Sequence, residues 1–202
     1  MIAPRVSASL WSVPVADLDR EALRLADAGL RTWHWDRADG TLGPAGGFTA
    51  AEARRLAELT GLASEAHLML ADPLAELDEW IEFCEVVVVH ASCSGAAEAL
   101  ERVAAAGRRG ALAFSPGDPL EQHAASGIDA LVMSVDPGHG GATFLPESLD
   151  RIAQLAPGRE RVGVDGGVTA DLARDARSAG ATWIVSGTAL LADPPAFLAP
   201  AP

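Results

Sequence analysis

Apolar residues in this chain gather in short runs that are separated by longer amphipathic stretches. The runs lie near residues 2–10, 31–36, 63–69, 85–90, 109–114, 129–134, 161–165 and 182–186. Apolar runs of this length, bounded by turn residues, predict strands, and the stretch after each run has the apolar spacing of a helix. The pattern therefore predicts about eight alternating strands and helices.

Turn and capping residues support the same division of the chain. A small residue followed by glycine precedes several apolar runs, where a helix end needs a left-handed backbone. The glycines expected at such ends are Gly29, Gly61, Gly107, Gly127, Gly158 and Gly180. The expected helix starts are two capping boxes and one proline at a first helical position: Thr49-x-x-Glu52, Asp118-Pro119-x-Glu121 and Asp72-Pro73.

The alternation predicts an α/β fold in which residues 1–202 form a single (βα)₈ TIM barrel domain. A chain of 202 residues with 49% apolar content can bury one sizeable core. A doubly wound open sheet is the alternative. The barrel is favoured because the polar candidate residues follow the C-terminal ends of strands. A barrel gathers these ends at one mouth, whereas an open sheet spreads them along an edge.

Charge and cysteine content narrow the possible partners. The net charge is −13, and no basic stretch extends beyond Arg54-Arg55 or Arg108-Arg109. Nucleic acid and anionic membrane surfaces are therefore excluded as partners, and a small-molecule site is expected. Cys84 and Cys93 are too few for a disulfide scaffold, which fits a reducing compartment. No basic leader with a long apolar core begins the chain, so we expect a cytoplasmic location.

Two residue types are missing from the chain. All 15 basic residues are arginine, and the chain has no tyrosine. Without lysine, a Schiff-base aldolase, a P-loop nucleotide site and a decarboxylase with a catalytic lysine are excluded. Aspartate, histidine, a metal ion and backbone amides remain as the working groups.

Four candidate metal ligands end three of the apolar runs: His34, Asp36, His67 and Asp165. His34 and Asp36 are two positions apart, so their side chains leave the same face of a strand. Two imidazoles and two carboxylates suit one divalent ion per chain, namely Zn²⁺, Mn²⁺ or Fe²⁺. The alternative is that the histidines are satisfied core residues and the aspartates are caps or ion-pair partners. His90 and Cys93 form a further candidate pair, with chance proximity as the alternative.

The two carboxylates suggest a reaction. In a barrel, Asp36 and Asp165 would reach a bound substrate from opposite sides of the ring of strands. Two such carboxylates can exchange a proton with either face of a carbon next to a carbonyl group. A metal ion would stabilise the resulting enediolate as a Lewis acid. The arrangement predicts inversion of a stereocentre.

Glycine-rich strand ends suggest a phosphate site. The glycines follow the last three strands: Gly138-His139-Gly140-Gly141, Gly166-Gly167 and Gly187-Thr188. Glycine permits close backbone approach, and amides at a following helix start point at an anion. The alternative is that these glycines only turn the chain. Ser9 is expected to reach the substrate, and Met69 and Met133 to line the mouth, with helix capping by Ser12 and ordinary methionine packing as alternatives.

Taken together, these motifs resemble the ribulose-phosphate 3-epimerase family over nearly the whole chain. The resemblance rests on IAP, SLWS, WHWDRADG, AHLM, VVVHAS, LVMSVDPGHGGATF, VGVDGG and VSGTALL, in that order. It implies a metal-dependent barrel that interconverts ribulose 5-phosphate and xylulose 5-phosphate. It also implies specific roles: metal ligands His34, Asp36, His67 and Asp165; acid and base Asp36 and Asp165; substrate contacts Ser9, His67, Met69, Met133 and Ala142; phosphate contacts Gly140, Gly141, Gly166, Gly167, Gly187 and Thr188.

Several positions depart from the family pattern: Arg37, Ala38, Ser92, Ser115 and Ala142. Most are smaller than the residues they replace, so we expect a wider pocket and an altered choice of sugar. A C3 epimerase of a phosphorylated ketose is the preferred function, and a homo-oligomer is expected. Alternatives are an epimerase of another ketose phosphate, a metal-dependent aldolase, or a catalytically silent sugar-phosphate-binding barrel.

Overall fold

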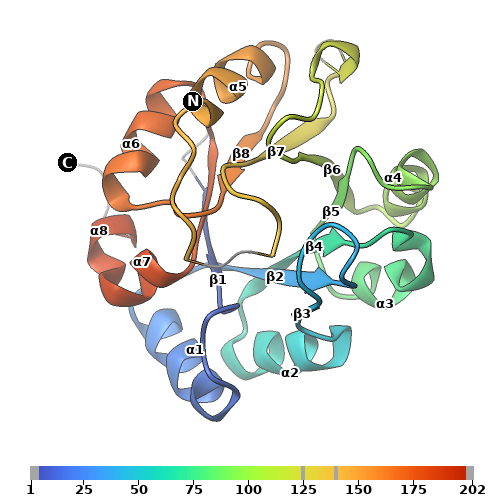
Figure 1. The fold of residues 1–202 in the computed structure, drawn as a ribbon. Helices are drawn as coiled ribbons and strands as arrows, with labels where there is room; N and C mark the ends of the chain where they lie inside the picture. The colour runs from blue at the N-terminus through green and yellow to red at the C-terminus, as the bar shows by residue number, and fades with distance from the viewer. Residues whose placement is uncertain (1–4, 124–125, 139–140, 199–202) are drawn as a thin grey trace.

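Eight parallel strands form the wall of a closed barrel (Figure 1). The computed structural model describes residues 5–123, 126–138 and 141–198. Its parallel strands are β1 (Arg5–Ser9), β2 (Thr32–Ala38), β4 (Ala63–Met69), β5 (Val86–His90), β6 (Arg109–Phe114), β7 (Asp129–Met133), β8 (Val162–Asp165) and β9 (Trp183–Ser186). Each overlaps one of the eight apolar runs, so the predicted strands are confirmed.

Closure distinguishes the barrel from the open-sheet alternative. The strands follow the order β1-β9-β8-β7-β6-β5-β4-β2, and β1 also pairs with β2. That last pairing, with Ser9 opposite His34, leaves no edge on the parallel sheet. The predicted (βα)₈ barrel is therefore confirmed.

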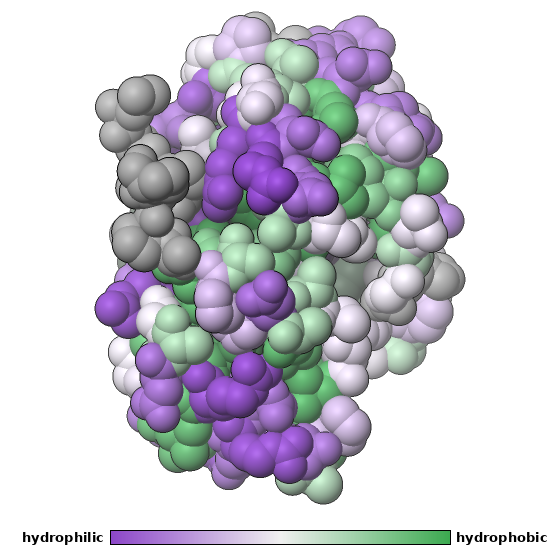
Figure 2. Space-filling model, turned by 90° about the vertical axis from the view of Figure 1, so that its left-hand side faces the viewer, coloured by the Kyte–Doolittle hydropathy of each residue, from purple (hydrophilic) through white to green (hydrophobic). Residues whose placement is uncertain are grey.

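Helices surround the barrel in Figure 1. They are α1 (Leu18–Asp27), α2 (Ala50–Thr60), α3 (Leu77–Ile81), α4 (Ala96–Ala105), α5 (Ser148–Leu155), α6 (Ala170–Ser178), α7 (Thr188–Ala192) and α8 (Pro194–Leu198). The face of the molecule that carries α6, α7 and α8 mixes hydrophilic and hydrophobic side chains (Figure 2). None of the helices in the described residues has the length and apolar character that crossing a bilayer requires.

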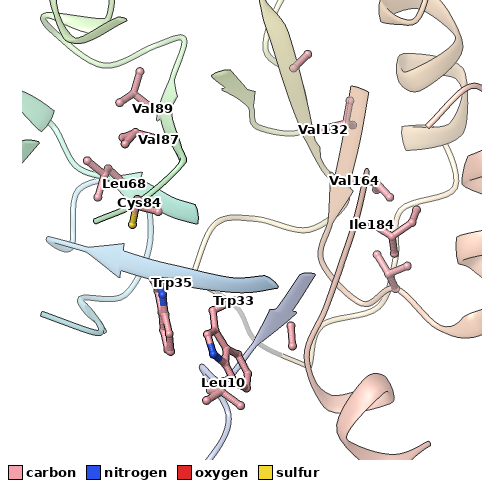
Figure 3. Packing of buried hydrophobic residues seen from close by; sticks show 14 of the residues in the cluster. Leu10, Trp33, Trp35, Leu68, Cys84, Val87, Val89, Val132, Val164 and Ile184 are labelled. Atoms are coloured by element: carbon pink, nitrogen blue, oxygen red, sulfur yellow. The ribbon is translucent and has the colours of Figure 1, made fainter. Parts of the chain in front are cut away.

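The buried apolar residues form two layers. The outer layer lies between strands and helices and includes Trp33 and Trp35, which are fully buried on the same side of β2 (Figure 3). Their indole nitrogens donate hydrogen bonds to Thr60 and Ser64. The inner layer fills the barrel: Val86, Val88, Ala111, Ala113, Leu131, Met133, Trp183 and Val185. Because side chains alternate along a strand, the outward tryptophans leave His34 and Asp36 pointing inward.

The capping predictions are largely confirmed. Thr49 and Glu52 form the predicted capping box at the start of α2. Asp72 accepts a hydrogen bond from the Leu74 amide where Pro73 opens a short 3₁₀ helix. All the glycines predicted at helix ends have positive φ angles.

The predicted helix after β6 is wrong within the described residues. Only a 3₁₀ turn, Glu121–His123, lies there before the two residues that the structure does not describe, and no described residue between β6 and β7 is α-helical. The Asp118 carboxylate accepts a hydrogen bond from the Ser115 amide at 2.7 Å, so it closes a turn instead of capping a helix. Arg151 of α5 fastens the same turn by donating to the carbonyl groups of Ser115 and Asp118.

A ninth, very short strand escaped prediction. β3 (Gly46–Gly47) pairs antiparallel with the end of β2. A Cβ atom on Gly47 would lie 2.0 Å from the carbonyl oxygen of Asp36, and the φ angle of Gly47 is +85°. Only glycine fits this close approach, which brings the chain after β2 back across the barrel mouth.

Candidate metal centre and substrate cavity

The four predicted ligands come together at the C-terminal end of the barrel. One candidate ligand atom from each of His34, Asp36, His67 and Asp165 lies within 4.8 Å of the others. The strand register brings them together, because Asp36 of β2 pairs with His67 of β4. Asp165 ends β8 and reaches the cluster from across the barrel. Both imidazoles are fully buried, and Asp36 is 6% exposed.

Asp36 lies at the centre of the cluster. Its Oδ1 lies 3.1 Å from Nδ1 of His67 and 3.3 Å from Nε2 of His34. The same two nitrogens each lie 3.8 Å from Oδ2 of Asp165. The second oxygen of Asp36 accepts a hydrogen bond of 2.6 Å from the Ser9 hydroxyl. Asp36 is therefore fixed at both oxygens.

The two aspartates have different electrostatic surroundings. Burial favours the neutral form of Asp36, but His34 and His67 outweigh this effect and hold its pKa below the usual value. Burial raises the pKa of Asp165, and the charge of Asp36 raises it further. Two neighbouring carboxyl groups whose pKa values are pushed apart are the arrangement expected of an acid and a base.

The chemistry of the cluster fits a divalent cation. Nε2 of His34 is buried and has no hydrogen-bond partner among the described residues, although it faces both carboxylates. Burial by itself would lower the pKa of His34, but Asp36 and Glu65 raise it well above the usual value. A positive charge is thus favoured at this point, and the donor set of two nitrogens and two carboxylates suits a transition-metal ion.

A cavity of about 370 Å³ opens above this cluster. The predicted site residues that line it are Ser9, Asp36, Met69, Met133, Gly141, Ala142, Asp165, Gly166, Gly167, Gly187 and Thr188. His34 and His67 are fully buried and do not line the cavity. Gly140, predicted to contact phosphate, lies outside the described residues.

Close packing explains part of the glycine content. A Cβ atom on Gly166 would lie 2.5 Å from Val135, and one on Gly167 would lie 2.5 Å from the carbonyl oxygen of Ala142. Gly187 precedes α7, and a Cβ atom there would lie 3.2 Å from the Ser9 carbonyl oxygen. These glycines bring backbone to the cavity wall, and phosphate binding there stays a prediction. The Ser12 hydroxyl lies 3.3 Å from that of Thr188 and caps no helix.

Only some of the departures from the family pattern reach the cavity. Ala142 lines it, whereas Ala38, Ser92 and Ser115 are not among its described lining residues. Arg37 forms a two-pronged ion pair with Glu76, at 2.7 and 2.8 Å. Because Asp36 points inward, its neighbour Arg37 points away from the cluster. The expected widening of the pocket is therefore limited to Ala142, and Arg37 adds no cation to the site.

Sequence reasoning missed several residues around the site, among them Glu65, His90 and Trp11. Glu65, two positions before His67, is fully buried and contacts Nδ1 of His34 at 2.8 Å. His90, considered only as a partner of Cys93, instead lies with Nε2 3.0 Å from Nε2 of His67. Trp11 lines the cavity. The period of two along a strand could have placed Glu65 on the inner face with His67.

The fold and cluster define a (βα)₈ barrel with a candidate metal-dependent active site at its mouth. Solved structures support the fold. The tryptophan synthase alpha-subunit from Pyrococcus furiosus superposes with a TM-score of 0.69, at 15% identity over 95% of this chain and 91% of that chain. A heptulosonate-phosphate synthase from Thermotoga maritima gives a TM-score of 0.62, at 15% identity over 92% and 75% of the two chains.

Sequence comparison gives the family. The model described as "Ribulose-phosphate 3 epimerase family" matches residues 5–191. The ribulose-phosphate 3-epimerase of Mycobacterium bovis is 31% identical over 92% of this chain and 86% of its own length. That of Eremothecium gossypii is 28% identical over 95% of this chain and 88% of its own length. The chain belongs to the ribulose-phosphate 3-epimerase family, a family of carbohydrate epimerases.

Proposed function

We propose that this protein is a metal-dependent epimerase that inverts C3 of a phosphorylated ketose and interconverts ribulose 5-phosphate and xylulose 5-phosphate. Family membership supports the reaction type. The observation that carries the proposal is the meeting of Asp36 and Asp165 at one buried cluster with their pKa values shifted in opposite directions.

Each aspartate has a role in moving one proton. The lowered pKa of Asp36 keeps its carboxylate ionised, so it can remove the C3 proton from one face of the sugar. The raised pKa of Asp165 favours its protonated form, which returns a proton to the opposite face. In the reverse direction the roles exchange. The two strands that carry these residues approach the substrate from different sides, so the proton comes back to the other face.

Four side chains would hold the metal: His34, Asp36, His67 and Asp165. One ion of Zn²⁺, Mn²⁺ or Fe²⁺, when bound, would supply Lewis-acid stabilisation of the negative charge that develops on the sugar oxygens. The Ser9 hydroxyl holds Oδ2 of Asp36 and leaves Oδ1 toward the cluster. Met69 and Met133 would limit access of water from the cavity wall.

The phosphate group would be held without a charged side chain. The described lining of the cavity contains no arginine, but it includes backbone at Gly141, Gly166, Gly167 and Gly187 and the hydroxyl of Thr188. Backbone amides of glycine-rich turns are effective donors to anions. The loops after the last two strands are the usual phosphate position in this fold. The phosphate group of the substrate is therefore expected to be held by backbone amide dipoles and the Thr188 hydroxyl.

The direct test uses solvent isotope exchange. Purified protein with ribulose 5-phosphate in D₂O is expected to form xylulose 5-phosphate that carries deuterium at C3. Deuterium incorporation into other ketose phosphates tests the alternative substrates, and the appearance of cleaved products tests for aldolase activity. Binding of the sugar phosphates without exchange would contradict the proposal and indicate a silent binding barrel.

The lining by Ala142 favours a second candidate, an epimerase of a different ketose phosphate. Its small side chain would leave room for a longer sugar, and one changed packing contact alters substrate preference by about 10- to 200-fold. Ala142→Gln is expected to shift the ratio of kcat/KM toward the pentulose phosphate, with Ser92→Gln, at an exposed position outside the described cavity lining, as the control. An unchanged ratio would show that Ala142 does not select the substrate. A homo-oligomer, a cytoplasmic location and a single domain over residues 1–202 stay predictions.

A further inference from the structure

Glu65 lies fully buried inside the barrel, beneath the candidate metal cluster. Its Oε1 accepts a hydrogen bond of 2.8 Å from the indole nitrogen of Trp183 and contacts Nδ1 of His34 at the same distance. Nε of Arg5 lies 3.4 Å from its second oxygen. Such a carboxylate accepts hydrogen bonds only, so the proton in the contact with His34 belongs to the imidazole.

The position of Trp183 shows that this contact is built into the barrel. The indole ring lies in the inner layer and packs against Gly163. A Cβ atom on Gly163 would lie 2.6 Å from the ring. Glycine at this position of β8 therefore makes room for an inward tryptophan. The indole donates to Glu65 and, at 3.3 Å, to Ser7. Oε1 of Glu65 is thus held by Trp183 as well as by His34, which fixes the position of the carboxylate.

His34 and His67 face the cluster with different ring nitrogens. With Nδ1 committed to Glu65, His34 presents Nε2, which lies 3.3 Å from Oδ1 of Asp36. His67 presents Nδ1, which lies 3.1 Å from the same oxygen. Its Nε2 points away and lies 3.0 Å from Nε2 of His90.

His90 completes the second half of the arrangement. Its ring stacks on that of His67, with centroids 5.1 Å apart and planes 17° apart. Its other nitrogen, Nδ1, lies 3.3 Å from the Ser115 hydroxyl. A metal ion at the cluster requires an unprotonated Nδ1 on His67. The proton of that ring is then on Nε2, which donates a hydrogen bond to Nε2 of His90. The His90 Nδ1 proton is then donated to Ser115.

We propose that Glu65 and His90 are positioning residues that hold the two histidine ligands in opposite tautomers. Glu65 makes His34 bind a metal ion through Nε2, and His90 makes His67 bind the same ion through Nδ1. The inference rests on the metal site of the proposed function. A partner on the far nitrogen of a ligand histidine orients the ring and raises its basicity, and loss of such a partner commonly weakens metal binding about 10- to 100-fold.

Long-range ¹H–¹⁵N NMR of the zinc-loaded protein tests the tautomers directly. We expect zinc on Nε2 of His34 with a proton on Nδ1, and zinc on Nδ1 of His67 with a proton on Nε2. Assignment uses His34→Asn and His67→Asn samples. Zinc bound through the same nitrogen in both residues would overturn the inference while leaving the proposed function intact. Failure of the protein to bind zinc, manganese or iron would overturn both.

Zinc competition measurements test the two positioning residues. Glu65→Gln and His90→Leu are each expected to weaken zinc binding about 10- to 100-fold. Glu85→Gln is the matched control for Glu65, because Glu85 also pairs with Arg5, at 3.7 Å, but does not touch His34. His123→Leu is the control for His90. Unchanged zinc affinity in a folded Glu65→Gln or His90→Leu protein would overturn the role of that residue, and the NMR result on the unmodified chain decides the matter if a variant does not fold.

Discussion

Buried carboxylates have different ion-pair partners at the two ends of the barrel. At the N-terminal end of the strands, Arg109 pairs with Asp129 and with Glu160, and these pairs raise the pKa of Arg109. At the C-terminal end, the ion-pair partners of Asp36 and Asp165 among the described residues are histidines only. One end is neutralised by an arginine, whereas the other offers carboxylates and imidazoles that an additional cation could bind.

This difference separates stability from function. Arginine supplies hydrogen bonds and an opposite charge to a buried carboxylate, so a carboxylate paired in this way is not available to bind a ligand. Asp36 and Asp165 have no arginine partner among the described residues, and they border the cavity, where a ligand can reach them. In barrels of this type, active sites lie at the C-terminal face, which agrees with the distribution of charge. The following predictions test whether the two ends are as distinct as this comparison implies.

The largest effect is expected at the mouth. Asp36→Asn and Asp165→Asn should each lower kcat by about 10²- to 10⁴-fold, because each residue is proposed to transfer a proton. Thermal unfolding and circular dichroism should show that the barrel still folds. Near-normal turnover in either variant would show that its carboxylate is not an acid or base in the reaction.

Removal of metal should have the next largest effect. Treatment with a chelator is expected to lower turnover at least about 100-fold, since the charge that develops on the sugar would lack its stabilising cation. Adding back Zn²⁺, Mn²⁺ or Fe²⁺ should restore activity, and elemental analysis should give about one ion per chain. Full activity of a chelated protein that contains no metal would refute the proposed mechanism.

The opposite end should respond in stability alone. Asp129→Asn leaves the Arg109 guanidinium with a weaker partner, so the free energy of unfolding should fall by about 1–3 kcal/mol. Urea denaturation measures this change. The kcat and KM of the folded variant should stay within about twofold of the unmodified values, because the pair lies at the other end of the strands. A loss of turnover comparable with that of Asp36→Asn would remove the distinction between the two ends.

The smallest effect concerns acid stability at the mouth. Burial, reinforced by His67, lowers the pKa of His90 to about 3. The unfolded chain binds a proton at this residue below a pH of about 6.5. The folded state does not, so the contribution of His90 to stability is present above pH 6.5 and is lost as the pH falls toward 3.

Urea denaturation of metal-free protein between pH 6.5 and 5.5 measures this effect. The unmodified chain should lose up to about 1.4 kcal/mol more per pH unit than His90→Asn, which has no proton to bind there. His123→Asn controls for the loss of a histidine that lies outside the cluster. Parallel pH profiles for the unmodified chain and His90→Asn would contradict the lowered pKa.

The sequence by itself determined the strands, most helix ends and the four candidate ligands. These features depend on local rules. Side chains alternate along a strand, glycine accepts positive φ angles, and the spacing of motif residues can be read directly from the sequence. His34 and Asp36, two residues apart, had to share a face in any strand. The capping box at Thr49 and Glu52 is equally local, and it formed as predicted.

The tertiary structure decided what those residues contact. Closure by the β1–β2 pairing excluded the open sheet, and the turn fastened by Arg151 replaced the helix predicted after β6. Which nitrogen of His34 faces the cluster depends on Glu65 and Trp183, from strands that lie far apart in the chain. Strand register and close packing set these partners, and both arise only when distant segments are brought together, so the pattern along the sequence could not specify them.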